Sequence, residues 1–212
     1  HLTGMPTLLL SSRNAHKSDE IAAILEDRFT VQTLATFPDA PEVEEDADTF
    51  AANAVKKAVE IAAWLNGQPL DQARPDFVLA DDSGLAVDAL DGQPGVRSAR
   101  YAGGDSNAPD AANNAKLLRE MDDIPDGTRG AQFQCVLALA ALGQAAEVVT
   151  FDGICRGAIA RVQTGEGGFG YDPLFIPDGH SRSFAELGQA VKNEISHRAR
   201  ALAKLADHFA SN

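Results

Sequence analysis

The sequence predicts one domain with a mixed α/β fold, and three observations support this class. In the first half of the chain, short apolar runs that suit strands alternate with segments of helical periodicity. From Ala131 onward the pattern changes to apolar runs separated by short turns, as in antiparallel strands. The length of 212 residues is ordinary for one domain, and no internal repeat or flexible linker interrupts it. Strand–helix alternation followed by a meander indicates a mixed α/β fold.

The expected strands are short apolar or alternating runs bounded by turn residues. The first half contains three of them, at residues 7–11, 29–34 and 77–81. The second half contains four, at residues 131–142, 146–153, 154–162 and 174–177. We expect the first three of these four to pair antiparallel through short turns that contain glycine.

Four segments have the spacing of amphipathic helices. One follows Ser12, and the others are residues 49–66, 107–121 and about 193–209. The helix at 49–66 is the clearest, because Thr49 can cap its start and Gly67 follows its end. Its apolar residues recur every three or four positions, at Phe50, Ala54, Ala58, Ile61 and Leu65.

The composition excludes several classes of function. The net charge of −13 repels phosphate backbones, so nucleic acid is not an expected partner. A small polyphosphate that arrives with Mg²⁺ can still bind in a locally basic pocket. No apolar run reaches the roughly 18 residues of a membrane span, so no membrane is expected, and no signal peptide is visible.

The two cysteines, Cys135 and Cys155, lie in apolar segments without metal-ligand spacing. We therefore expect them to be core residues in a reducing compartment. Residues 1–4, which precede Met5, are interpreted as an expression remnant and are left out of the expected domain.

The stretch VLADDSGLAVDAL, residues 78–90, contains the most unusual polar residues. Asp81 and Asp82 directly follow an apolar strand candidate, and open α/β sheets bind ligands at such strand ends. One or two carboxylates together with substrate phosphates are the usual ligands of Mg²⁺. The alternative is a turn closed by Asp82, Ser83 and Gly84. The apolar run directly before the charges favours the cation site.

Two polar segments precede expected helices, and each admits a simpler interpretation. Residues 12–17 (SRNAHK) could bind an anion through backbone N–H groups and Lys17, but taken alone they suit helix capping by Ser12 or Asn14 better. Glu44 and Glu45 precede the long helix, where acidic residues are favourable to the helix dipole. Taken alone, they suit a solvated helix start.

Two later segments also have unusual chemistry. The glycines of residues 167–172 (GGFGYD) allow the backbone to approach a ligand closely, and Phe169 can stack on a base. Taken alone, these glycines would also suit a hairpin turn. Lys192, His197 and Arg198 are expected in or just before the opening turn of the last helix. Basic residues there run against the preference of the helix dipole, which favours a bound anion or polar ligand. The alternative is a solvated basic face.

Together these segments occur in one order over about residues 8–209, as SxxNxxK, EE…TFxxNAxxKA, ADDSGLxVDAL with PGVRSARYAG, GGFGYDPLF and KNxISHRxxA. The series closely resembles the Mg²⁺-dependent non-canonical purine nucleoside triphosphate pyrophosphatases, the inosine/xanthosine triphosphatase or Ham1-like family. This resemblance implies hydrolysis of ITP, dITP and XTP to the monophosphate and pyrophosphate, which cleanses the nucleotide pool. It also implies a cytoplasmic homodimer. The implied fold is a single domain, residues 5–212, whose elongated mixed β-sheet and flanking helices form two lobes around a central cleft.

The resemblance also implies roles for single positions. Glu45 and Asp82 match the metal-binding acids, with Glu44 as a neighbour of Glu45, and Asp82 matches the catalytic proton acceptor. The residues themselves leave the proton acceptor open between Asp81 and Asp82. The expected substrate-binding residues are Ser12, Arg13, Asn14, Ala15, His16, Lys17, Ser83, Phe169, Gly170, Tyr171, Asp172, Lys192, His197 and Arg198.

Among these residues, Lys17 and Lys192 are expected to hold the phosphate tail, and Arg198 and His197 to donate to a 6-oxo purine. The chain departs from the family at Arg13 and His16, where members often have glycine. Three other functions stay open: a non-catalytic nucleotide sensor, a pyrophosphatase for modified pyrimidine triphosphates, and a phosphate-monoester hydrolase.

Overall fold

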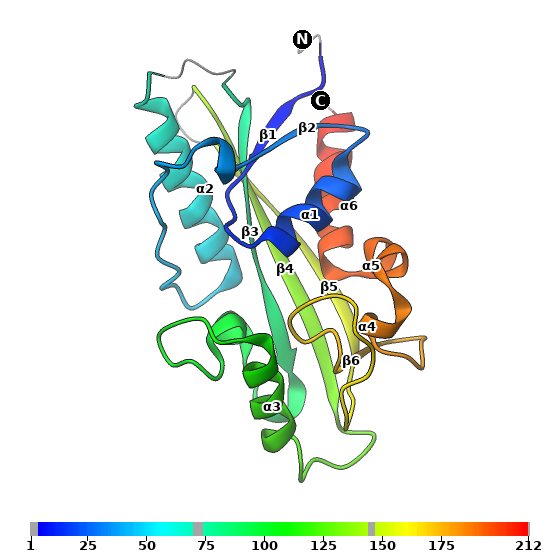
Figure 1. Cartoon of the computed structure of the whole chain (residues 1–212). Helices are drawn as coiled ribbons and strands as arrows, with labels where there is room; N and C mark the ends of the chain where they lie inside the picture. The colour runs from blue at the N-terminus through cyan, green and yellow to red at the C-terminus, as the bar shows by residue number, and fades with distance from the viewer. Residues whose placement is uncertain (1–3, 70–73, 144–146, 212) are drawn as a thin grey trace. The chain divides into compact units, whose positions relative to one another are not determined.

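The computed structural model describes residues 4–69, 74–143 and 147–211. Most of the expected N-terminal remnant and Ala146, the first residue of one expected strand, lie outside the described residues. In the described part, the chain forms six strands in one sheet, in the order β2-β1-β3-β4-β5-β6 (Figure 1). The strands are β1 (Thr7–Leu10), β2 (Thr30–Thr33), β3 (Phe77–Val87), β4 (Gly130–Ala141), β5 (Val148–Ile159) and β6 (Phe175–Pro177).

The sheet is mixed, as the sequence predicts. β1 pairs in parallel with both β2 and β3, whereas β5 and β6 pair antiparallel. The α-helices are α1 (Ala15–Leu25), α2 (Phe50–Asn66), α3 (Asp110–Glu120), α4 (Phe184–Leu187), α5 (Gln189–Ile195) and α6 (His197–Ala210). Short 3₁₀ helices span Leu34–Thr36, Asp88–Leu90 and Gly95–Arg100. None of the helices in the described part of the chain is long and apolar enough to cross a membrane.

The chain divides into two compact units. Unit 1 comprises residues 1–82, 135–152 and 201–212, and unit 2 comprises residues 83–134 and 153–200. One division falls between Asp82 and Ser83, inside β3. The central cleft that the resemblance implies stays a prediction.

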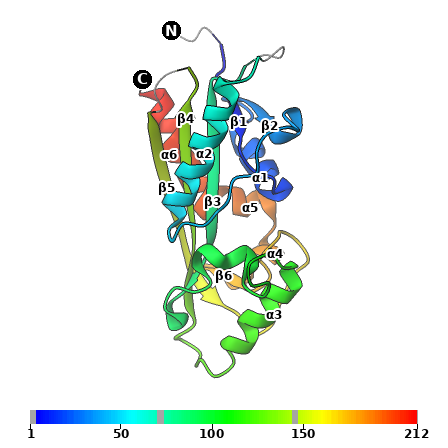
Figure 2. The ribbon, with the colours of Figure 1, turned by 90° about the vertical axis from the view of Figure 1, so that its left-hand side faces the viewer.

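Unit 1 has a hydrophobic core on each face of its strands. Alternate residues of a strand point to opposite faces, and β1 follows this rule. Leu8 and Leu10 pack in one core with α1 and α6, whereas Leu9 packs in the other with α2. Figure 1 shows α2 on one side of these strands and α1 and α6 on the other, and Figure 2 views the α2 side. The strands are therefore covered on both faces, which accounts for their continuous apolar sequence.

Unit 2 packs its strands against α3 and α4. Its core joins Leu117 of α3 and Met121, which follows that helix, to the aromatic rings of Phe133, Phe175 and Phe184. The rings of Phe133 and Phe175 have centroids 4.5 Å apart. This core anchors both α3 and the chain that follows β6, and these segments position the glycine-rich loop described below.

Three predicted boundaries are wrong. Residues 146–153 and 154–162 were expected to be two strands, but β5 continues without a turn through Asp152 and Gly153. The alternation of exposed and buried residues is unbroken there, and Asp152 lies on the exposed side, paired with Lys204 at 2.7 Å. The last helix is broken at Ser196, which has extended backbone angles and whose side chain accepts a hydrogen bond from the N–H of Ala199. The third wrong boundary is the end of β3, which was expected at Asp81 but lies at Val87.

Candidate active site

The two adjacent aspartates lie inside a strand and not at its end. β3 continues for five residues beyond Asp82, so both the expected strand end and the alternative turn are wrong. Asp, Ser and Gly are typical turn residues, which is why the sequence suggested a break. Gly84 serves a close approach instead, because a Cβ there would lie 2.4 Å from Ser98 Oγ. The pleat of the strand sends the side chains of Asp81 and Asp82 to opposite faces.

Asp81 points to the face that carries Cys135. Lys17 Nζ lies 3.0 Å from its Oδ1, and the thiol of Cys135 donates to its Oδ2 at 3.2 Å. Asp81 is 2% exposed, so this ion pair is buried. Its two carboxylate oxygens are therefore both occupied by side chains of unit 1. Cys135 is the buried residue that the sequence predicts, and it also contributes this hydrogen bond.

Asp82 differs from its neighbour in having a carboxylate oxygen available. Asp82 is 7% exposed, and among the described residues its buried Oδ2 has no hydrogen-bond partner. Burial raises the pKa of Asp82 to about 6, and Glu45 adds to this increase. The charges of Lys57 and Lys17 and a hydrogen bond with Asn53 oppose it. Removal from water, rather than the charge of a neighbouring acid, is thus the main cause of the perturbed pKa.

Lys57 of α2 connects the acids of unit 1. Its Nζ donates to the backbone oxygen of Asp81 at 2.6 Å and forms an ion pair with Glu45. Asn53 lies one helical turn earlier and also reaches Asp82. Sequence reasoning assigned no role to Lys57 or Asn53, although both belong to the segment TFxxNAxxKA. A lysine in a solvated helix gives no signal of its own.

The neighbouring acid Glu44 is exposed, and its charge acts on Lys56. Glu45 is also exposed, but it is the member of the acidic pair whose charge acts on Asp82. Among the described residues, no group of three or more His, Cys, Asp and Glu side chains is arranged to hold a metal ion. Mg²⁺ does not require such a cage, because it binds through one or two carboxylates plus substrate phosphates. Glu45 and Asp82 fit that requirement, since the buried Oδ2 of Asp82 has no hydrogen-bond partner among the described residues.

The segment before α1 is built by helix capping, the interpretation that the sequence favours. The side chain of Asn14 accepts from the N–H of Lys17 at 3.2 Å, and Ser12 Oγ accepts from the N–H of Asn14 at 3.1 Å. Arg13 donates to the backbone oxygen of Ala40 at 2.8 Å. Ala15 and His16 are exposed at the start of the helix. Capping does not exclude an anion, since the positive end of α1 stays accessible.

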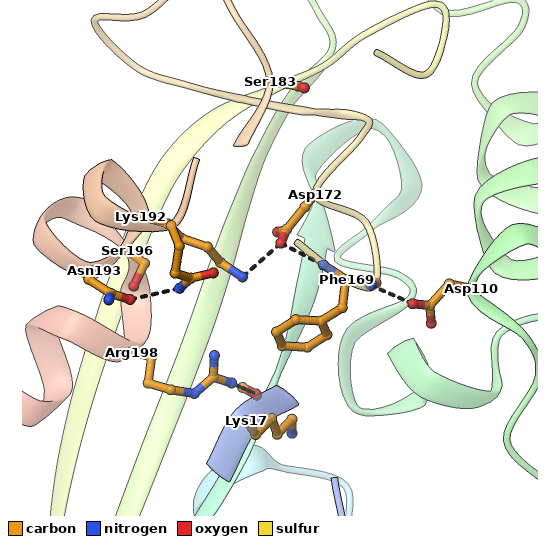
Figure 3. Close-up of polar contacts among 12 residues, drawn as sticks. Lys17, Asp110, Phe169, Asp172, Ser183, Lys192, Asn193, Ser196 and Arg198 are labelled. Carbon is orange, nitrogen blue, oxygen red and sulfur yellow. Dashed lines mark hydrogen bonds and ion pairs between the residues drawn. The ribbon is translucent and has the colours of Figure 1, made fainter. Parts of the chain in front are cut away.

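The glycine-rich loop in unit 2 is organised by Asp172. Its Oδ2 accepts from the N–H of Phe169 at 3.0 Å and pairs with Lys192 Nζ at 2.7 Å (Figure 3). Gly168 has a φ of +73°, and a Cβ there would lie 2.2 Å from Asp172 Oδ2, so only glycine fits. Tyr171 is buried, and its hydroxyl donates to the backbone oxygen of Ser98 at 2.6 Å.

Lys192 lies close to the ring of Phe169. It is 2% exposed, and its Nζ is 4.3 Å from the ring centroid. A cation over an aromatic face is favourable when both are desolvated. Because the ammonium is also paired with Asp172, Lys192 contacts two residues of the glycine-rich loop.

The start of α6 places two further predicted residues in unit 2. Arg198 is 1% exposed and donates from Nη2 to Ser83 Oγ at 2.8 Å. The ring of His197 stacks on Phe133, with centroids 4.8 Å apart and planes 15° from parallel. A basic pair buried at a positive helix end needs compensation, and Ser83 supplies part of it for Arg198.

Comparison with known proteins places this chain among relatives of one kind. Residues 8–208 match the model of the Ham1 family. A dITP/XTP pyrophosphatase of Geobacter sulfurreducens is 51% identical over 97% of this chain and 97% of its own length. A dITP/XTP pyrophosphatase of Geobacillus kaustophilus is 48% identical over 97% and 95%, respectively. Among solved structures, a HAM1 protein from Coxiella burnetii has a TM-score of 0.82 and 37% identity, covering 98% of this chain and 100% of that one.

Proposed function

Because the chain belongs to the Ham1 family, we propose that it is a nucleoside triphosphate pyrophosphatase that acts on non-canonical purine nucleotides. The proposed substrates are dITP and XTP, which appear in the names of its relatives, and also ITP. The products are the nucleoside monophosphate and pyrophosphate, so the activity would remove these nucleotides from the pool. The observation that carries the proposal is Asp82, a buried carboxylate with an open oxygen among the charges of Lys17, Lys57 and Glu45.

Asp82 is the better candidate for the proton acceptor. Both oxygens of Asp81 are occupied by Lys17 and Cys135, whereas Oδ2 of Asp82 has no partner among the described residues. In the metal-free protein the pKa of Asp82 is about 6, so this carboxylate is ionised and able to accept a proton at neutral pH. Asp82 would orient a water for attack on the α-phosphorus and accept its proton. The bond between the α-phosphorus and the bridging oxygen then breaks, and pyrophosphate leaves.

Asp82 and Glu45 would hold Mg²⁺ together with phosphate oxygens of the substrate. When bound, the metal ion polarises the phosphate oxygens and neutralises part of their charge. Lys17 and the N-terminal end of α1, capped by Asn14, would bind the triphosphate tail. These residues all belong to unit 1.

The residues proposed for the base all belong to unit 2. Phe169 would stack on the purine ring, and Arg198 and His197 would donate to the 6-oxo group. Adenine has an amine at that position and would leave the donors unpaired, which is how large discrimination arises. The contact of Lys192 with Phe169 and Asp172 supports a role for Lys192 on the base side rather than at the phosphate tail.

The proposal is tested by incubating the protein with dITP and MgCl₂ and measuring pyrophosphate and orthophosphate separately. Pyrophosphate with dIMP supports it, and Asp82→Asn should abolish this release. Orthophosphate alone would indicate a phosphomonoesterase, and no product would indicate a nucleotide sensor. Faster turnover of a modified pyrimidine triphosphate would indicate the pyrimidine-specific alternative.

The resemblance to the family also leads us to propose a homodimer that acts in the cytoplasm. Light scattering coupled to size-exclusion chromatography tests the oligomeric state directly. A molar mass near 22.4 kDa would indicate a monomer and contradict the dimer.

A further inference from the structure

Helix α3 holds the glycine-rich loop of unit 2 through two side chains that sequence reasoning did not single out. Asp110 and Asn114 lie four residues apart, one helical turn, and therefore on the same face. Asp110 Oδ2 accepts from the N–H of Gly170 at 2.7 Å, and Asn114 Nδ2 donates to the backbone oxygen of Gly170 at 2.9 Å. One residue of the loop is thus bonded at both of its backbone polar groups by one helix. Figure 3 shows Asp110 beside the loop that carries Phe169.

These two contacts complete a set that fixes the backbone on both sides of Phe169. The N–H of Phe169 donates to Asp172, and its carbonyl accepts from the N–H of Asp172 at 3.2 Å. With Gly170 held by α3, four consecutive backbone polar groups have partners. Gly170 has a φ of +61°, a conformation that glycine adopts readily and that the hydrogen bonds to Asp110 and Asn114 stabilise.

The side chain that this backbone presents is the proposed stacking group. Phe169 is half-buried, and the ammonium of Lys192 lies over its ring. A ring held in this way loses little conformational freedom when a base binds, so less of the binding free energy is spent on ordering. The two hydrogen bonds to Gly170 limit rotation of the backbone next to Phe169 and so help to keep its ring in one orientation.

Asn114 has a further feature that sets it apart from an ordinary structural amide. It is 2% exposed, and its Oδ1 has no hydrogen-bond partner among the described residues. Among the described residues, its side chain therefore makes one hydrogen bond, the donation to Gly170. Replacement by Asp keeps the size of the side chain but puts a carboxylate oxygen in place of the Nδ2 donor. The hydrogen bond to the backbone oxygen of Gly170 is then lost.

We propose that Asp110 and Asn114 are positioning residues for base recognition, acting through Gly170 on the ring of Phe169. This inference rests on the proposed function for the identity of the base, but not for the coupling between α3 and the loop. Loss of the Asn114 donor should raise the Kd for dIMP and the KM for dITP by about five- to tenfold, the effect of one buried hydrogen bond. The kcat should stay within about twofold, because the reacting phosphate is bound elsewhere.

The experiment is a double-mutant cycle. The Kd for dIMP is measured by calorimetry, and kcat and KM for dITP by pyrophosphate release, for the parent, Asn114→Asp, Phe169→Ala and the double variant. If Asn114 acts through the ring, its substitution has less than about a twofold effect once Phe169 is absent. Independent, multiplicative effects would overturn the proposal, as would a Kd for Asn114→Asp equal to that of the parent.

The matched control is Ala111→Gly, on the exposed first turn of the same helix. Glycine lowers the helix propensity of α3 without removing either hydrogen bond to Gly170, so Kd and KM should stay unchanged. An equal rise in this variant would mean that the helix matters only for stability. Asp110→Ala and Asp110→Asn provide a second pair, since the amide retains an acceptor and should restore most of the affinity. If the parent releases no pyrophosphate yet the dIMP cycle shows coupling, the proposed function fails and the positioning role stands.

Discussion

Replacement of Asp82 by Asn should make the metal-free protein more stable at neutral pH while abolishing its activity. The carboxylate is buried and its Oδ2 has no partner among the described residues, so its charge is costly in the folded state. Burial raises the pKa of Asp82 from 3.8 to about 6. An isosteric amide removes this cost because it carries no charge to desolvate.

The sign and size of the effect follow from proton linkage. Between pH 4 and 6 the folded state binds more protons than the unfolded state, so the stability of the parent falls as the pH rises through this window. The difference of about two pH units between folded and unfolded pKa corresponds to roughly 3 kcal/mol. Asp82→Asn should therefore match the parent near pH 4 and exceed its unfolding free energy by up to about 3 kcal/mol at pH 7 to 8.

The assay is urea unfolding in EDTA at several pH values between 4 and 8. Asp81→Asn is the matched control, because the same substitution at the adjacent residue removes one partner of a buried ion pair with Lys17. Asp81→Asn should destabilise the protein by about 3 kcal/mol, opposite in sign to Asp82→Asn. If Asp82→Asn were less stable than the parent at pH 8, the interpretation that the buried charge of Asp82 destabilises the folded state would be refuted. Pyrophosphate release near the parent's rate would refute its catalytic role.

Three further substitutions test other parts of the account. Lys57→Gln removes the strongest of the interactions that lower the pKa of Asp82, so in EDTA the stability of this variant should continue to fall to a higher pH than that of the parent; an unchanged pH window would contradict this. Gly84→Ala places a methyl group 2.4 Å from Ser98 Oγ and should cost about 2–4 kcal/mol, whereas Gly67→Ala, with no contact closer than 3.5 Å, should be nearly neutral. Equal urea midpoints would show that β3 has room at Gly84. Arg198→Ala should reduce the dITP-to-ATP ratio of kcat/KM by at least about tenfold, and a constant ratio would exclude Arg198 from base readout.

Much of the fold could be predicted from local signals. The cap of α2 at Thr49, the helix end before Gly67 and the apolar strands of the first half follow from rules that act within a few residues. The predicted strand end at Asp81 and the predicted turn at Asp152 were wrong for one reason. A polar or small residue in a strand looks like a turn unless its partner is known, and the partners, Lys17 and Lys204 among them, are distant in sequence.

The candidate site shows the same limit. Its acids and the aromatic loop were visible because carboxylates after an apolar run and clustered glycines are unusual. Lys57, Asp110 and Asn114 were not singled out, since each belongs to an amphipathic helix where such residues are common. Their roles depend on which residue the helix packs against, and only the tertiary structure supplies that. The difference between Asp81 and Asp82 likewise comes from the environments on the two faces of β3.

The most direct test of the proposed function is a substrate panel with both phosphate products quantified. The purified protein is incubated with MgCl₂ and dITP, XTP, ITP, ATP, GTP or dTTP, and pyrophosphate and orthophosphate are measured in each reaction, with Asp82→Asn as the inactive control. The account predicts pyrophosphate and no orthophosphate, with the highest kcat/KM for dITP, XTP and ITP and at least about a hundredfold lower values for ATP. Orthophosphate as the product, equal efficiency with ATP, or turnover that persists in Asp82→Asn would contradict it.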